Sequence, residues 1–581
     1  MSLRCVLPRL LVGLFPFALA STVYLYLYPV FSGCAYPLPQ RTPDVPPRTS
    51  AFLSTLRQHL VSQYAQESEP AIFRLLVLAD PQLEGDSSLP RPENELGARI
   101  WRHWTDTLVA AKTAPSPLHG DVLKTLGAAL RVLVSEDLPH AVGAARKRLD
   151  LLGNDYYLAH IYRTLHWWTR PTHVTVLGDL LGSQWVTDEE FQRRGDRYWH
   201  RVFRGGSRVS DEITRTGEKG YSAGAEEGQD SELEELHSSS SWAHRIINVV
   251  GNHDIGYSGD ASERRIERFE RVFGRANWDI RFQHPPVASG ETGKPVLTPS
   301  LHLINLNSLT LDTPPYSQDV LSHSYAYLND IIAHRSYPVD DRTTFTLLLT
   351  HLPLHKAEGI CSDAPYFTFF DADDESGKQR YRSGGLREQN HLSEHVSTNG
   401  ILQGIFGMSD DADGTGHGRG RNGLILTGHD HTGCDVLHYM NTPSPLHSNP
   451  DAETPSLGND TLTNEETATL PRWTWNAKRY NSSDPHTSSL PSIREITLRS
   501  MMGEYGGNAG LLSLWFDVDT GEWKYAMVMC PAGVQHIWWA VHVVDLITLV
   551  AAAVYILLWL CGSLTQSRSR VLAVGGDKKT R

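Results

Sequence analysis

Histidine, asparagine and aspartate residues follow several short apolar runs of this chain. The clearest case is Gly428-His429-Asp430-His431, which comes directly after the apolar run 424–427. Two imidazoles two residues apart at the end of a strand can face two adjacent metal ions, because a tight turn lets neighbouring side chains diverge. Taken alone, the pattern favours a loop with two solvated histidines. The other apolar runs decide between the two interpretations.

Four more apolar runs end in residues of the same types, and each is short and dense enough to predict a buried strand. The residues that follow them are Asp80, Asp179, Asn252 with His253 and Asp254, and His351. A single Asp or His in such a place is usually a helix cap or a turn residue. In α/β sheets, however, loops at the carboxyl ends of strands meet at one crevice. Five such sets therefore predict one shared metal site.

In this order, the five sets resemble the signature of the calcineurin-like metallophosphoesterases, over about residues 73–530. The resemblance implies an α/β fold in which two mixed β-sheets pack face to face between helices, with a dinuclear metal centre at one edge. It implies one ion held by Asp80, Asp179 and His431, and a second held by Asp179, Asn252, His351 and His429. Such ligands suit two divalent ions, with manganese expected and iron or zinc as alternatives.

Two residues beside the ligands carry further expectations. His253 has no metal in this assignment, so we expect it to stabilise the phosphoryl oxygens or to protonate the leaving alkoxide, with Asp254 fixing its tautomer. Gln82 departs from the family, which usually has histidine two residues after Asp80. Glutamine can ligate through its carbonyl oxygen but is a weaker donor, which predicts a weaker or manganese-preferring first site, or a degraded one.

Two apolar runs of membrane-spanning length lie at 10–31 and 537–560. Basic residues precede the first run and follow the second, so both flanks are expected in the cytosol and the body between them in a lumen. A cleaved signal peptide is the alternative for the first run, because Ala18-Leu19-Ala20 has the form of a cleavage site. We predict a cytosolic N-terminus at 1–9, a spacer at 32–70, the metallophosphoesterase domain at 71–532 and a cytosolic tail at 561–581.

Several features fit a body that lies in an oxidising lumen. Cys34, Cys361, Cys434 and Cys530 form an even set. Cys361 and Cys434 each follow a histidine motif, and the other two each lie beside an apolar run, so we expect these two pairs. Glycosylation sequons occur at Asn459 and Asn481. Lys578 and Lys579 resemble the dilysine address that coat proteins read on endoplasmic-reticulum membrane proteins, with a plain basic tail as the alternative.

Four insertions are expected in the body, near 94–168, 205–241, 408–422 and 441–492. The first has a helical pattern, and its aromatic residues between 156 and 168 indicate packing, with a membrane-surface or glycan-facing patch as the alternative. The others are rich in Gly, Ser, Asp or Pro. A net charge of −13 without a basic cluster in the body argues against nucleic acid as a partner.

Within the family, the two apolar runs, Asp80-Pro81-Gln82 and the late run 494–507 are most similar to the endoplasmic-reticulum phosphodiesterases that remove ethanolamine phosphate from a mannose of glycosylphosphatidylinositol (GPI) anchors. This implies a GPI lipid or GPI-anchored proteins as substrate, and a role in anchor remodelling and export. The alternatives are a phosphodiesterase for another lipid or sugar diester, and an inactive membrane receptor for GPI-anchored cargo, which only Gln82 motivates.

Overall fold

The computed structural model describes most of the chain. The described residues are 3–37, 51–61, 72–85, 89–113, 120–218, 233–236, 240–287, 296–335, 338–362, 364–371, 380–409, 415–441, 474–481 and 491–576. Asn459, Lys578 and Lys579 lie outside these ranges. Asn481 is described and exposed.

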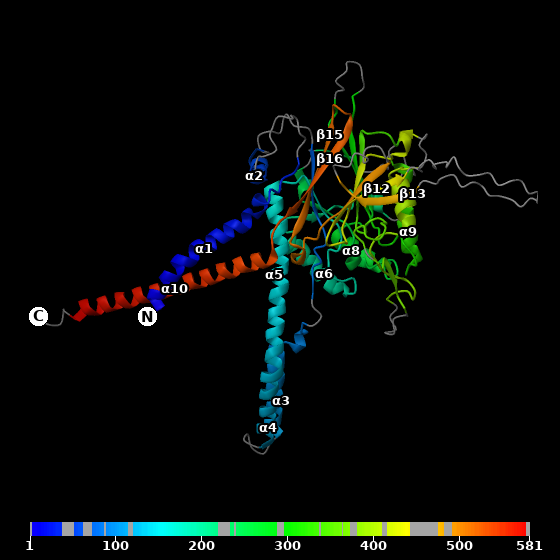
Figure 1. Cartoon of the computed structure of the whole chain (residues 1–581). Coiled ribbons are helices and arrows are strands. Elements are labelled where there is room, and N and C mark those ends of the chain that lie inside the picture. The colour runs from blue at the N-terminus through cyan, green and yellow to red at the C-terminus, as the bar shows by residue number, and fades with distance from the viewer. Residues whose placement is uncertain are drawn as a thin grey trace, which may run out of the picture.

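Two mixed β-sheets form the body (Figure 1). Among the described residues, the first sheet has six strands in the order β16-β15-β1-β2-β5-β3: β1 (Ile72–Leu78), β2 (His173–Val176), β3 (Ser207–Arg208), β5 (Arg245–Asn248), β15 (Asn508–Asp517) and β16 (Glu522–Pro531). The second has eight in the order β13-β12-β14-β11-β8-β7-β6-β4: β4 (Leu233–Glu235), β6 (Trp278–Gln283), β7 (Ser300–Leu306), β8 (Thr344–Thr350), β11 (Gly423–Thr427), β12 (Cys434–Asn441), β13 (Thr474–Arg479) and β14 (Ser492–Thr497). A small separate sheet pairs β9 (Phe367–Phe369) with β10 (Leu386–Gln389).

The two sheets pack on each other through alternate residues of their strands. Phe73 and Val77 of β1 lie in one core with Phe345 of β8, whereas Leu76 and Leu78 of β1 lie in a second core that includes residues of the helices. Because successive side chains of a strand point to opposite faces, both faces of β1 are covered and its sequence is apolar throughout. The predicted α/β fold with two packed mixed sheets and flanking helices is confirmed.

Parallel pairing places the ends of the central strands together. In the first sheet β1, β2 and β5 are parallel neighbours, and in the second β8 and β11 are parallel. The loops that leave these five strands therefore emerge at the same edge of each sheet. The two sheet edges together carry all the predicted ligands.

Helices cover the sheets and extend the molecule. Those of the body include α6 (Asp188–Arg197), α7 (Asn252–Ile255), α8 (Glu263–Phe273) and α9 (Gln318–His334). The segment expected as a helical insertion forms α3 (Leu96–Thr113), α4 (Gly120–Val132), a π turn (Leu133–Asp137) and α5 (Leu138–Thr169). In Figure 1 these helices form an arm that projects from the body. The segment near 205–241 contains the edge strands β3 and β4.

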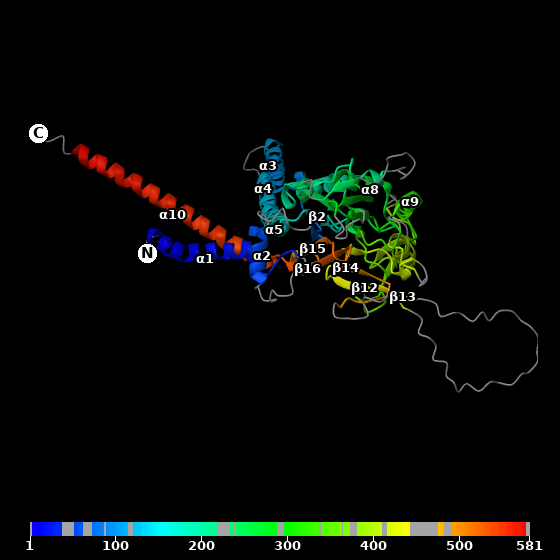
Figure 2. The ribbon, with the colours of Figure 1, turned by 90° about the horizontal axis from the view of Figure 1, so that it is seen from above.

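Both ends of the chain form long apolar helices, α1 (Leu3–Phe31) and α10 (Gln535–Gly576), with α2 (Ala51–Val61) after the first. The stretches Val6–Phe31 and Gln535–Gly562 are long and apolar enough to cross a membrane, and fit one transmembrane helix at each end. The two helices run side by side in Figures 1 and 2, and the Thr22 hydroxyl donates to Asp545 Oδ2 at 2.9 Å.

Two disulfides join distant parts of the described chain. Cys34 after α1 is bonded to Cys530 of β16, which ends just before α10. Cys361 is bonded to Cys434 at the start of β12. These are the two pairs expected from the positions of the cysteines in the sequence.

Candidate metal centre

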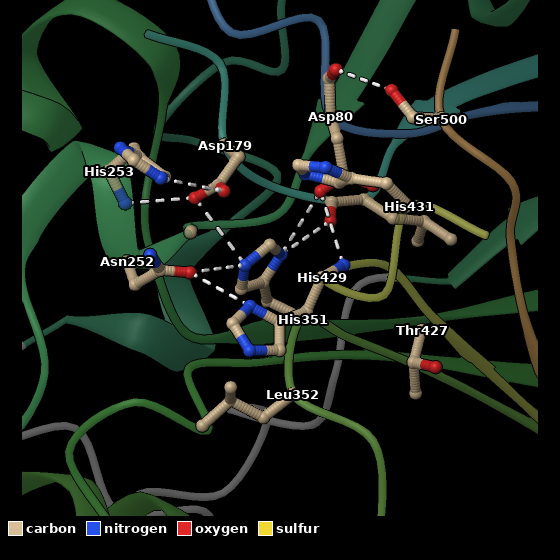
Figure 3. A network of polar contacts seen from close by, with 12 residues as sticks. Asp80, Asp179, Asn252, His253, His351, Leu352, Thr427, His429, His431 and Ser500 are labelled. Carbon is tan, nitrogen blue, oxygen red and sulfur yellow. Dashed lines mark hydrogen bonds and ion pairs between the residues drawn. The ribbon is translucent and has the colours of Figure 1, made fainter. Parts of the chain in front are cut away.

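The predicted ligands lie together at the edge where both sheets end (Figure 3). The first sheet supplies Asp80 and Asp179, from the loops after β1 and β2, and Asn252, from the start of α7 after β5. The second supplies His351, His429 and His431, from the loops after β8 and β11. Side-chain atoms of Asp80, Asp179 and His351 lie within 4.8 Å of one another. Residues more than 300 positions apart in the sequence therefore share one site.

Asp179 lies between two groups of side chains. Its Oδ1 is 3.4 Å from His351 Nε2, and Asn252 Oδ1 lies 2.9 Å from the same nitrogen and 3.0 Å from His429 Nδ1. On the other side, Asp179 Oδ2 is 3.0 Å from Gln82 Nε2, which lies 3.1 Å from His431 Nε2. The two oxygens of Asp179 therefore face different groups of side chains.

The backbone at the site is held in an uncommon conformation. Asp80, Asp179 and His429 have φ angles of 51°, 50° and 72°, in the left-handed region that non-glycine residues rarely adopt. Such strain persists only where the surrounding structure enforces it, and it is concentrated at functional sites. Gly178 has a φ of 89°, and a Cβ there would lie 2.3 Å from His351 Nδ1. The turn before Asp179 therefore requires glycine.

Backbone carbonyls orient two of the imidazoles. His351 Nδ1 donates to the Leu177 carbonyl at 2.8 Å, and His429 Nε2 donates to the Gln389 carbonyl at 2.9 Å. Burial lowers the pKa of His351. Burial and the nearby His351 together lower the pKa of His429 to about 3. Both rings are therefore neutral at pH 7. Their other nitrogens then present lone pairs toward Asn252 Oδ1. Three electron-pair donors that meet at one point are the arrangement of a metal site.

The two carboxylates give the site its charge. Asp80 and Asp179 are buried, and Asp80 Oδ2 has no hydrogen-bond partner among the described residues. Burial and the charge of Asp179 raise the pKa of Asp80 well above its usual value. Burial opposes ionisation of Asp179, but the positive charge that His351, His253 and His429 carry when protonated at low pH, together with the His253 backbone N–H, outweighs it and lowers its pKa. Because buried carboxylates are costly without a cation, these residues fit divalent metal ions.

Gln82 points into the site at the place where the family usually has histidine. As the amide is oriented here, Nε2 faces both Asp179 and His431, and Gln82 has a φ of 41°. An amide nitrogen donates hydrogen bonds and does not bind a metal, so in this orientation Gln82 supports its neighbours by hydrogen bonding instead of ligating through its oxygen.

His253 lies at the mouth of the site, and its side chain is 36% exposed. Its Nε2 is 3.8 Å from Asp179 Oδ2, within reach of a group bound between the ligands. The expected role of Asp254 is wrong in this structure, because both carboxylate oxygens accept backbone N–H groups, from Gly251 at 2.8 Å and from Leu181 at 3.0 Å. The His253 Nδ1 has no hydrogen-bond partner among the described residues. Asp254 therefore positions the loops that carry Asp179 and Asn252.

A cavity of about 320 Å³ opens over the site. Beside the predicted residues it is lined by Trp185, Tyr257, Phe370, Arg387 and Glu388. Arg387 and Glu388 lie in β10, Phe370 follows β9, and Trp185 and Tyr257 lie in the segments after β2 and α7. No sequence motif marked these residues. A second cavity of about 360 Å³ shares His429 and His431 with the first.

No family model matches the chain. Protein TED1 of Saccharomyces cerevisiae is 33% identical over 432 residues, which cover 69% of this chain and 77% of that protein. An uncharacterized protein of Schizosaccharomyces pombe is 26% identical over 69% of this chain and 80% of its own length. Metallophosphoesterase 1 of Cricetulus griseus is 22% identical over 59% of this chain and 68% of its own length.

The two-sheet α/β body with carboxylate, amide and imidazole groups at the ends of its strands defines a metal-dependent phosphoesterase, and the relatives named metallophosphoesterase agree with this class. The chain belongs to the metallophosphoesterase superfamily, in the family of Protein TED1.

Proposed function

We propose that this protein is a dinuclear phosphodiesterase of the endoplasmic-reticulum lumen that removes ethanolamine phosphate from a mannose of GPI anchors. The observation that carries the proposal is the pair of side-chain groups on either side of Asp179. The resemblance to the GPI-remodelling phosphodiesterases supports the substrate. The two long apolar helices also support it, because they would hold the cavity near a bilayer in which a GPI lipid is embedded.

Each ligand has a role in this proposal. Asp80, Asp179 and His431 would hold one ion, and Asp179, Asn252, His351 and His429 the other, with manganese the expected metal. When bound, two such ions polarise a phosphoryl group and activate water. His253, at the cavity mouth, binds the phosphoryl oxygens or gives its proton to the leaving sugar alkoxide.

The cavity lining suits a charged sugar phosphodiester. The aromatic faces of Trp185 and Phe370 can pack against a sugar ring, and the Arg387 guanidinium can attract the phosphate. The carboxylate of Glu388 can attract the ammonium group of ethanolamine.

The catalytic assignment is tested with the purified full chain in detergent. We expect about two metal ions per chain. The His253→Ala variant should hydrolyse a model phosphodiester about 10²–10⁴-fold more slowly, with unchanged metal content. His334→Ala, at a histidine on α9, is the matched control. Equal rates for His253→Ala and the parent would remove the catalytic role.

The substrate is tested by mass spectrometry of GPI anchors from cells that lack the protein. We expect anchors that retain an ethanolamine phosphate on one mannose, and recovery with the parent chain but not with Asp179→Asn. Unchanged anchors would reject the GPI role in favour of another lipid or sugar diester.

The position of Gln82 favours an inactive receptor for GPI-anchored cargo as the second candidate function. This candidate predicts that the Asp179→Asn variant restores export of GPI-anchored proteins as well as the parent chain does.

A further inference from the structure

The arm formed by α3, α4 and α5 exposes apolar side chains along its whole length. On the long helix the exposed apolar residues recur every three, four or seven positions: Leu126, Leu130, Val134, Leu138, Val142, Leu149, Leu152 and Tyr156. Such spacing places them on one side of the continuous helix that runs through α4, the π turn and α5. Val134 and Val142 are 65% and 63% exposed. A soluble helix normally packs such a stripe against a core.

Helix α3 has a stripe of its own, made by Trp101, Trp104 and Leu108. The two helices of the arm touch where His103 Nε2 lies 2.9 Å from Asp137 Oδ2. In α3 the stripe residue Trp104 directly follows His103, and in the long helix the stripe residue Leu138 directly follows Asp137. In each helix, the stripe residue is rotated by about 100° around the helix axis from the contact residue before it. Because the two helices are antiparallel and face each other at the contact, both rotations lead to the same side of the pair. The two stripes therefore lie on one face of the arm.

This face is the side from which the apolar helix α10 leaves the body. Gly153 lies four residues after Leu149 on the striped side of α5, and a Cβ there would lie 1.7 Å from the Trp539 ring of α10. The next residue, Asn154, accepts a hydrogen bond from Gln535 at the start of α10. Further along α5, Trp168 Nε1 donates to the Tyr26 carbonyl of α1 at 2.8 Å. The base of the arm therefore packs on both apolar helices at their body-side ends.

The arm runs across the direction of these helices. In Figure 1 α1 and α10 extend sideways while α3, α4 and α5 run down the page, and in Figure 2 the arm is seen almost end on. A bilayer crossed by α1 and α10 lies across their axes. The arm accordingly runs along its surface, at the level where α10 begins.

We propose that α3 and the α4–α5 helix form an interfacial hairpin whose apolar face lies in the boundary between the headgroups and acyl chains of the phospholipid bilayer that α1 and α10 cross. Tryptophan is enriched at this depth, and an amphipathic helix binds there through its apolar face. The proposal rests on the arm and the apolar helices and is independent of the phosphodiesterase activity.

Spin labels on the full chain in phosphatidylcholine nanodiscs test the proposal. In a background with Cys5→Ser and Cys561→Ser, single labels are placed at Trp104→Cys, Leu126→Cys and Val142→Cys on the apolar face. The matched controls Asp106→Cys, Ala128→Cys and His140→Cys are exposed and lie two residues away, on the other side of the same helices. Collision rates of each label with oxygen, which dissolves in lipid, and with a water-soluble nickel chelate are then measured.

We expect a severalfold higher ratio of oxygen to nickel collisions at the three apolar positions than at their controls. Equal ratios would place the arm in water and overturn the proposal. Protection of the apolar positions from both reagents would also overturn it, because it would show that a protein partner or a second copy of the chain covers this face.

Discussion

Gln82 is the residue at which this site differs from the family pattern, and its contacts make the difference testable. Its amide lies 3.0 Å from Asp179 and 3.1 Å from His431. We expect Gln82→His to bind metal about tenfold more tightly, or about 1.4 kcal/mol, because imidazole nitrogen is a better donor to transition metals than a neutral amide. Metal retained against a chelator measures the change.

Gln184→His is the matched control for this substitution. Gln184 lines the same cavity but hydrogen-bonds Asp260. A gain in metal affinity at both positions would show only the effect of an added imidazole, and a loss at Gln82→His would show that the amide itself is required.

Asp254 is the residue whose role the structure changes, from catalysis to support of two loops. Replacing it with asparagine turns an amide N–H₂ toward backbone N–H donors from Gly251, Leu180 and Leu181. We expect Asp254→Asn to lower the free energy of unfolding by about 1–3 kcal/mol and to release metal faster. Thermal unfolding with and without a chelator measures both effects. His253→Ala should unfold like the parent, and a parent-like Asp254→Asn would contradict the supporting role.

At the scale of elements, the sequence predicts strand ends well because each ligand directly follows a buried apolar run. It could not show that Asp254 binds backbone groups about 70 residues away, or that the Gln389 carbonyl orients His429. These contacts depend on how loops pack. A backbone N–H or carbonyl can come from almost any residue type, so no residue pattern in the sequence identifies it. Similarly, the pattern over 94–168 predicts helices, but only the tertiary structure leaves their apolar stripe exposed.

The strand β14 is tied to its neighbours by a buried charge network around Glu495. Its carboxylate lies 2.6 Å from Lys356 Nζ and 2.9 Å from His438 Nε2 of β12. Burial opposes ionisation, but Lys356 and His438 outweigh it and lower the pKa of Glu495 to about 2. We expect Glu495→Gln to lower the free energy of unfolding at pH 7 by about 3–5 kcal/mol, because it leaves Lys356 buried without its counterion.

The pH dependence of this effect has a definite sign. The pKa of Glu495 is lower in the folded state than the ordinary value of about 4.3, so its contribution is fully present above that pH and is lost as the pH falls toward 2. The difference in urea unfolding between parent and Glu495→Gln should therefore narrow below about pH 4.3. Glu263→Gln, at an exposed position on α8, should show no such difference. A constant difference from pH 7 to pH 3 would contradict the assignment.

At the scale of the whole molecule, the two disulfides have different tasks. Cys34–Cys530 closes a loop of 496 residues between the two apolar helices, far along the chain from the ligands. Cys361–Cys434 lines the second cavity and joins the segments that follow His351 and His431.

We expect the double variant Cys34→Ser/Cys530→Ser to lose about 2–5 kcal/mol of unfolding free energy and to keep its rate on a model phosphodiester. The rate should instead fall in Cys361→Ser/Cys434→Ser, because the His431 loop loses its tether. Denaturant unfolding and initial rates, measured on both variants below their unfolding transitions, separate the two tasks. Equal rate losses in the two variants would show that the site depends on the anchoring of the helices as well as on the local loop.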